Sequence, residues 1–300
     1  MRSSSLTLIV FLSVANVFGA TGRAESGLHS NRTTKAKTAG GDSAAGYIKK
    51  AQGLLLENDR ESAVRTVLAA LARNAGGATG LGELKRELFT VTEMFVSEKG
   101  QRTFELGRSL AAQDLKTAKG KFLEALSLEK DNLSIIRELA RVHLAQGECQ
   151  SVYELSRQGL LYNPYNSEIF LLRLQAKACL GTLEDVEAEL SNPYVDMVGL
   201  EPYIGLVRAQ AALTKNAYSE AIEELNKAKA KSPSFPEIYF WMGKAQQLIE
   251  KSPREAFTHY VTLCREKVPS SLTRSMEPRL CRQVAEIEKT LEAMKVEKTE

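Results

Sequence analysis

The sequence predicts an all-α protein, a solenoid in which antiparallel helix pairs stack along the chain. Two observations support this prediction: a helical pattern that repeats with a period near 34 residues, and prolines that follow several of the repeats. The stretch from Tyr218 to Pro233 is typical, because Ala221, Leu225 and Ala228 lie on one stripe of a helix that a proline then ends.

The period can be followed through five units in register. At one position of the second helix, small or β-branched residues recur at intervals of 34 or 35 residues: Ala118, Val152, Val186, Ala221 and Ala256. Four residues later a second set recurs in step: Phe122, Ser156, Leu190, Leu225 and Tyr260. Upstream, a small residue often precedes the set: Gly107, Ala140, Ala209 and Gly243.

This pattern resembles the tetratricopeptide repeat family, in which small residues at set positions let paired antiparallel helices approach closely. The resemblance implies a right-handed α-solenoid whose first helices line a concave surface. The unit from Ser167 to Asn192 departs from the pattern, with Leu174 and Val186 where small residues are expected. Its second helix is therefore expected to be short or tilted.

Residues 1–24 have the layout of a secretory signal peptide, with one arginine, an apolar run from Leu6 to Phe18 and then small residues. The apolar run is short for a membrane span, which needs roughly 20 residues. A retained membrane anchor is the alternative. Cleavage after Gly19, Gly22 or Ala24 fits the sequence, and the mature chain is expected to be exported, to a bacterial periplasm or outside the cell.

The remaining chain divides into four parts. Residues 25–43 are polar and small, with almost nothing to bury, and are expected to be a disordered linker. In residues 44–99 the pattern predicts a helix pair and an extra amphipathic helix from Leu84 to Phe95. We expect an irregular joint between this part and the main array. Residues 100–269 form the array of about five units. Residues 270–300 predict a polar-faced capping helix with Leu280, Val284, Ile287 and Leu291 directed inward.

The composition excludes some classes of partner. The chain has 40 basic and 37 acidic residues, and a net charge of +3 gives no electrostatic footprint for nucleic acid or for an anionic membrane. The three histidines, His29, His143 and His259, are scattered, and no C-x-x-C, P-loop or nucleophile-elbow motif occurs. We therefore expect no enzyme, no metal and no cofactor.

Four cysteines in an exported chain are expected to be oxidised. Cys149 opens the second helix of one unit and Cys179 lies near the end of the first helix of the next, so both are expected at the same edge of the stack. Cys264 and Cys281 would then form a second, local disulfide. Buried free thiols in a reducing compartment are the alternative.

The family resemblance places one set of side chains along a concave groove. Three arginines fall at one end and aromatic and amide residues at the other, which suits an acidic or C-terminal peptide. The alternative is that these arginines are ordinary solvated residues and that binding occurs elsewhere. The predicted groove residues are Phe104, Arg108, Arg137, Arg141, Leu171, Gln175, Tyr203, Leu206, Gln210, Phe240, Lys244 and Gln247.

The sequence thus favours an exported, non-enzymatic scaffold that holds an unidentified partner protein or peptide, or that assists assembly of an envelope complex. A second hypothesis is a homo-oligomeric structural subunit. It would self-associate through the extra helix from Leu84 to Phe95 or through the C-terminal helix.

Overall fold

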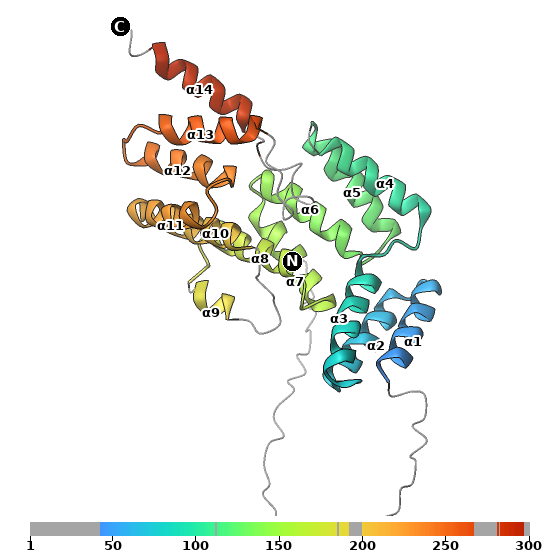
Figure 1. Cartoon of the computed structure of the whole chain (residues 1–300). Helices are drawn as coiled ribbons and strands as arrows, with labels where there is room; N and C mark the ends of the chain where they lie inside the picture. Colours follow the sequence, from blue (N-terminus) through green and yellow to red (C-terminus); the bar gives the residue numbers. More distant parts are fainter. Residues whose placement is uncertain are drawn as a thin grey trace, which may run out of the picture. The chain divides into compact units, whose positions relative to one another are not determined.

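The computed structural model of the chain describes residues 43–111, 113–184, 186–191, 200–266, 281 and 283–296. All regular structure within these ranges is helical (Figure 1). The predicted signal peptide and all but the last residue of the predicted linker lie outside the described residues.

Fourteen helices follow one another in the described part of the chain. Three of them make up the N-terminal part: α1 (Ala44–Leu56), α2 (Arg60–Ala72) and α3 (Gly77–Glu93). The next five are α4 (Glu98–Leu110), α5 (Leu115–Leu128), α6 (Leu133–Ala145), α7 (Cys149–Tyr162) and α8 (Ser167–Cys179). The last six are α9 (Val186–Leu190), α10 (Glu201–Thr214), α11 (Tyr218–Lys231), α12 (Pro236–Leu248), α13 (Arg254–Arg265) and α14 (Val284–Val296).

Neighbouring helices pack in pairs, and from α6 onward the first helices of successive units also contact one another. The pairs α4 with α5, α6 with α7, α10 with α11 and α12 with α13 are in contact (Figure 1). The first helices of successive units, α6, α8, α10 and α12, touch in that order. This second set of contacts brings four helices to one common surface.

The small residues of the repeat lie where helices touch. Ala118 and Ala221 are fully buried. A Cβ at Gly107 would lie 2.8 Å from the ring of Phe122, so any larger side chain there would separate α4 from α5. A Cβ at Gly205 would lie 2.5 Å from Ala228, which holds α10 close to α11 in the same way. The predicted role of these positions is confirmed.

The third unit of the array is the irregular one, as the sequence predicts. Its second helix, α9, has five residues and buries none of them fully. Val186, which stands where Ala118, Ala221 and Ala256 stand in other units, packs only partly against the core, as does Leu190. Pro193, which stands where Ala125 and Ala228 stand in other units, lies outside the described residues.

Buried asparagines start two of the first helices. Asn132 caps α6 by accepting the N–H of Ser134 at 3.0 Å, and Asn166 caps α8 by accepting the N–H of Ile169 at 3.0 Å. Both side chains are almost fully buried. An asparagine cap satisfies donors that would otherwise be stranded at a helix start, so these residues fix where α6 and α8 begin.

The joint between the N-terminal helices and the array is held by a buried ion pair. Arg60, the first residue of α2, lies 2.7 Å from the carboxylate of Glu129 at the end of α5. The Arg60 guanidinium also donates to the carbonyl oxygens of Val91 at 2.6 Å and Met94 at 2.8 Å. The Glu129 carboxylate in turn accepts a backbone N–H from Val96 at 2.9 Å. The irregular joint is therefore an ordered network of polar contacts.

The two helices that were candidates for self-association bury their apolar faces inside the chain. In α3, Leu84, Leu88 and Val91 are fully buried against α1 and α2. In α14, Ile287 is fully buried against the core of the last units, and Val284 and Leu291 are partly buried there. Leu280 lies outside the described residues. These apolar residues thus pack within the chain, and self-association through the two helices stays a prediction.

Candidate partner-binding groove

The four first helices α6, α8, α10 and α12 enclose a groove with a volume of about 390 Å³. Its walls carry apolar side chains at the centre and polar groups around them. The lining residues are Arg141, Leu144, Ala145, Gly147, Glu168, Leu171, Leu172, Gln175, Cys179, Tyr203, Leu206, Gln210, Glu237, Trp241 and Gln283.

The centre of the groove is apolar. Leu171 of α8, Leu206 of α10 and Trp241 of α12 contribute one large side chain from each of three successive helices. Trp241 is the single tryptophan of the chain and is partly exposed. A partly open apolar surface of this kind offers a place for an apolar side chain of a partner.

Arg141 forms the charged end of the groove and is already paired. Its guanidinium lies 2.9 Å from Glu138 and 2.9 Å from Glu168. Burial lowers the pKa of Arg141 to about 10, and Glu168 opposes this shift. Because two carboxylates already bind the guanidinium, Arg141 is not poised to bind an acidic peptide. The predicted role of this arginine as a carboxylate receptor is therefore not supported by its geometry.

Three neutral polar groups in the groove make no hydrogen bond among the described residues. The Tyr203 hydroxyl is buried without a partner, and burial raises the pKa of this phenol. The side-chain amides of Gln175 on α8 and Gln210 on α10 are only partly buried and face the same groove. These groups therefore supply hydrogen-bonding capacity that no described residue of the chain uses.

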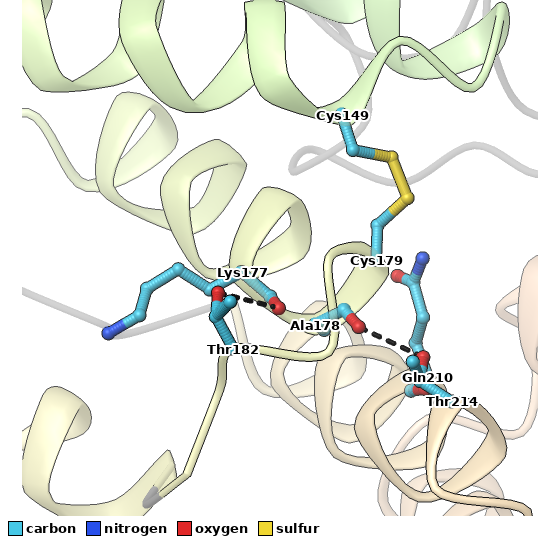
Figure 2. Close-up of a disulfide and its surroundings, with 7 residues drawn as sticks. All are labelled: Cys149, Lys177, Ala178, Cys179, Thr182, Gln210 and Thr214. Carbon is cyan, nitrogen blue, oxygen red and sulfur yellow. Dashed lines mark hydrogen bonds between the residues drawn. A yellow bond between two sulfur atoms is a disulfide. The ribbon is translucent and has the colours of Figure 1, made fainter.

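A disulfide closes one edge of the groove. Cys149, at the start of α7, is bonded to Cys179, at the end of α8, with the Cα atoms 6.1 Å apart (Figure 2). Next to it, the hydroxyl of Thr214 donates to the carbonyl oxygen of Ala178 at 2.9 Å and ties the end of α10 to the end of α8. Figure 2 shows the Gln210 side chain beside this disulfide. The edge is thus fixed by one covalent bond and one hydrogen bond.

The second disulfide joins Cys264 of α13 to Cys281, which precedes α14, with the Cα atoms 5.5 Å apart. Both pairs are those that the sequence predicts. Neither cysteine of this second pair lines the groove. The two disulfides therefore differ in their relation to the candidate site.

Six of the predicted groove residues line this groove together. They come from α6, α8 and α10: Arg141, Leu171, Gln175, Tyr203, Leu206 and Gln210.

Three predicted residues near the N-terminal side of the array have other roles. Phe104 is buried in the core and packs on Phe95 and Phe122, with ring centroids 5.0 and 5.7 Å away. Arg108 is exposed and pairs with Glu105 of its own helix at 3.3 Å. Arg137 pairs with Glu93 at the end of α3 at 2.9 Å and so belongs to the joint.

The three residues predicted on α12 do not line this groove. Phe240 is buried against Tyr260, with ring centroids 5.5 Å apart, and Lys244 pairs with Glu286 of α14 at 3.2 Å. Gln247 is exposed outside the groove. The groove face of α12 carries Glu237 and Trp241, which amounts to a rotation of about 100°, or one residue of helix.

The sequence reasoning missed Glu168, Glu237 and Trp241. Glu168 lies three residues before Leu171, which was assigned correctly, so helical spacing could have found it. Glu237 and Trp241 lie four residues apart and define a face of their own. No signal in the sequence distinguished that face from the one containing Phe240, because both contain an aromatic residue.

A second cavity, of about 490 Å³, is lined by residues of α9, α10 and α11 and the residues just before α9. Its polar groups are mostly charged side chains that pair with each other, such as Lys227 with Glu224 at 2.8 Å and Arg208 with Glu187 at 2.5 Å. It lacks an aromatic side chain and a buried unpaired hydroxyl among the described residues. The groove on the first helices is therefore the better candidate site.

Residues 210–249, from the last turns of α10 to the end of α12, match the family model described as TPR repeat. The chain carries a tetratricopeptide repeat. This match confirms the predicted repeat for residues 210–249, and the paired helices of the described residues confirm the predicted all-α fold. No curated protein matches the sequence.

Two solved structures are similar to the chain. A tetratricopeptide repeat protein from Parabacteroides merdae is 16% identical, with 85% of this chain and 91% of that chain covered and a TM-score of 0.39. A human IFIT1 dimer with m7Gppp-AAAA is 19% identical, with 83% of this chain and 68% of that chain covered and a TM-score of 0.41.

No helix among the described residues is both long and apolar enough to cross a membrane. The described residues also contain no cluster of three or more histidine, cysteine or acidic side chains suited to a metal ion.

Proposed function

We propose that this chain is an exported, non-enzymatic scaffold of the cell envelope that holds a partner protein or peptide in the groove formed by α6, α8, α10 and α12. The tetratricopeptide repeat indicates a protein interaction scaffold. The observation that supports the proposed site is the groove itself, which combines apolar side chains with a Tyr203 hydroxyl that makes no hydrogen bond among the described residues. Its mechanism is equilibrium binding, with no chemical step.

Export is supported by two independent features. The first 24 residues have the composition of a signal peptide. The four cysteines of the chain form two disulfides, and disulfides persist in oxidising compartments such as the periplasm. Fractionation of the native host and N-terminal sequencing of the mature chain test this part. A cytosolic chain that keeps its Met1 and four free thiols would contradict it.

The groove is tested by site-specific photo-cross-linking in the native host. A photoreactive amino acid replaces Gln210 of α10, which lines the groove, or Gln247 of α12, which is exposed and lies outside the groove. We expect a discrete covalent adduct with a partner from position 210 and a much weaker one from position 247. Equal adducts from both positions, or an adduct from position 247 alone, would show that binding occurs on another surface.

A further inference from the structure

We infer that the groove recognises a segment that is uncharged and apolar, and that it holds this segment through main-chain hydrogen bonds. This inference rests on the proposed function and specifies the chemistry of the partner. It replaces the acidic ligand that the arginine content of the sequence suggests.

The charged residues that line the groove all have partners within the chain. Arg141 is bound between Glu138 and Glu168, and Glu168 also lies 3.2 Å from Arg137. Glu237 accepts the backbone N–H of Cys281 at 2.9 Å. A charged ligand would have to displace one of these contacts and would also lose its own hydration. The ion pair that it formed in the groove would seldom offset the free energy of this desolvation. Charge complementarity therefore favours a neutral segment.

The unused hydrogen-bonding capacity of the groove is neutral. The Tyr203 hydroxyl, on a residue only 8% exposed, makes no hydrogen bond within the part of the chain that the structure describes. An unpaired polar group in such a buried position destabilises the protein. The unpaired hydroxyl therefore destabilises the free chain. A ligand carbonyl or N–H that forms a hydrogen bond with it would remove this destabilisation.

Gln175 and Gln210 extend this arrangement across two successive helices. Each glutamine amide offers both a donor and an acceptor, as a peptide group does. An extended segment presents its N–H and C=O groups at regular intervals, so side-chain amides on neighbouring helices can bind its main chain. The apolar side chains of the same segment then meet Leu171, Leu206 and Trp241. A volume of about 390 Å³ suits a short segment.

The first test is the variant Tyr203→Phe. Removal of an unpaired buried hydroxyl should raise the midpoint of thermal unfolding by roughly 2–5 °C. The same variant should bind the selected peptides described below about five-fold more weakly, the loss expected for one neutral hydrogen bond. A higher unfolding midpoint together with a weaker peptide affinity indicates a binding group. Removal of a hydroxyl with a purely structural role would instead lower the unfolding midpoint, with or without a loss of affinity. A lower unfolding midpoint with unchanged affinity would overturn the inference.

The second test uses a library of capped hexapeptides on the full-length mature chain. Capping removes terminal charges, so composition alone decides which peptides are retained. Retained peptides should be rich in Leu, Val, Ile and Thr and poor in Asp, Glu, Lys and Arg. Binding is then measured for single peptides by the emission of Trp241, which lies in the groove and is the single tryptophan of the chain.

Matched variants locate the binding. Gln210→Ala should weaken the selected peptides about five-fold, while Gln247→Ala, outside the groove, should leave them unchanged. N-methylation of the central peptide bonds should reduce affinity by about ten-fold or more, because it removes main-chain donors.

The outcomes separate the inference from the proposed function. Retained peptides that are acidic or basic, but that still shift Trp241 emission and depend on Gln210, would overturn the inference and leave the groove as the binding site. Retained peptides that leave Trp241 emission unchanged and are insensitive to Gln210→Ala would overturn both. Neutral peptides that keep their affinity after N-methylation would show that the groove does not bind the main chain of the segment.

Discussion

The buried ion pair at the joint gives the sharpest stability prediction. The side chain of Glu129 is fully buried, pairs with Arg60 at 2.7 Å, and accepts the N–H groups of Val96 and Ser97. The variant Glu129→Ala removes all three contacts and leaves a buried guanidinium without its counter-charge. Breaking a buried pair in this way costs about 3–5 kcal/mol. We expect a loss within that range, because Arg60 keeps its bonds to two carbonyl oxygens.

The assay is urea unfolding followed by circular dichroism and by the fluorescence of Trp241. The joint lies between α2, α3 and α5, whereas Trp241 is on α12. The variant should therefore lose helical signal at lower urea than the tryptophan reports, so that the two transitions separate. The control is Glu98→Ala, which removes an exposed pair with Arg102 and should cost less than about 0.5 kcal/mol. A loss below about 1 kcal/mol for Glu129→Ala, or coincident transitions, would refute the reasoning.

Two further predictions concern other buried groups. Burial raises the pKa of Glu87, and its bond from Gln52 opposes this only in part. Because the pKa of Glu87 in the folded chain lies above its unfolded value, the parent chain loses stability as pH rises through the folded pKa. In thermal unfolding, Glu87→Gln should therefore be more stable than the parent at pH 7. Below about pH 4 the two chains should be equally stable. Replacement of both Cys149 and Cys179 by serine, which opens a link across 30 residues, should cost about 3–4 kcal/mol in urea unfolding and shift Trp241 emission. A more stable parent at pH 7, or a serine variant as stable as the parent, would contradict these two expectations.

The repeat architecture could be predicted from the sequence because it depends on local rules repeated many times. Gly107 and Ala118 are each weak signals alone, but the same size restriction recurs at the same spacing in unit after unit. The short α9 was predicted for the same reason, since Leu174 and Val186 violate the restriction. Even the disulfide pairing followed from the repeat, because the register places Cys149 and Cys179 at one edge.

The joint could not be predicted in the same way, because its contacts are far apart in sequence and occur once. Nothing near Arg60 indicates that its partner is Glu129, 69 residues later. The same limitation explains the error in the groove. Arg137 shares a helix face with Arg141, which made both look like ligand-binding residues, but its partner Glu93 comes from α3 and turns it into part of the joint. Spacing along a helix locates a side chain on a face, and only tertiary contacts decide whether its charge is still available.

This distinction changes which residues of the groove carry information about its partner. In the sequence the arginines attract attention, because a guanidinium is a strong and specific receptor for carboxylates. In the folded chain the carboxylates of Glu138 and Glu168 already fill that role for Arg141. What remains is the apolar centre around Trp241 and the neutral groups of Tyr203 and Gln210, which no other side chain of the described structure satisfies. The specificity of the groove should therefore be set by neutral hydrogen bonding and apolar burial, and its affinity should change little with ionic strength, since screening acts only on charges that a ligand meets.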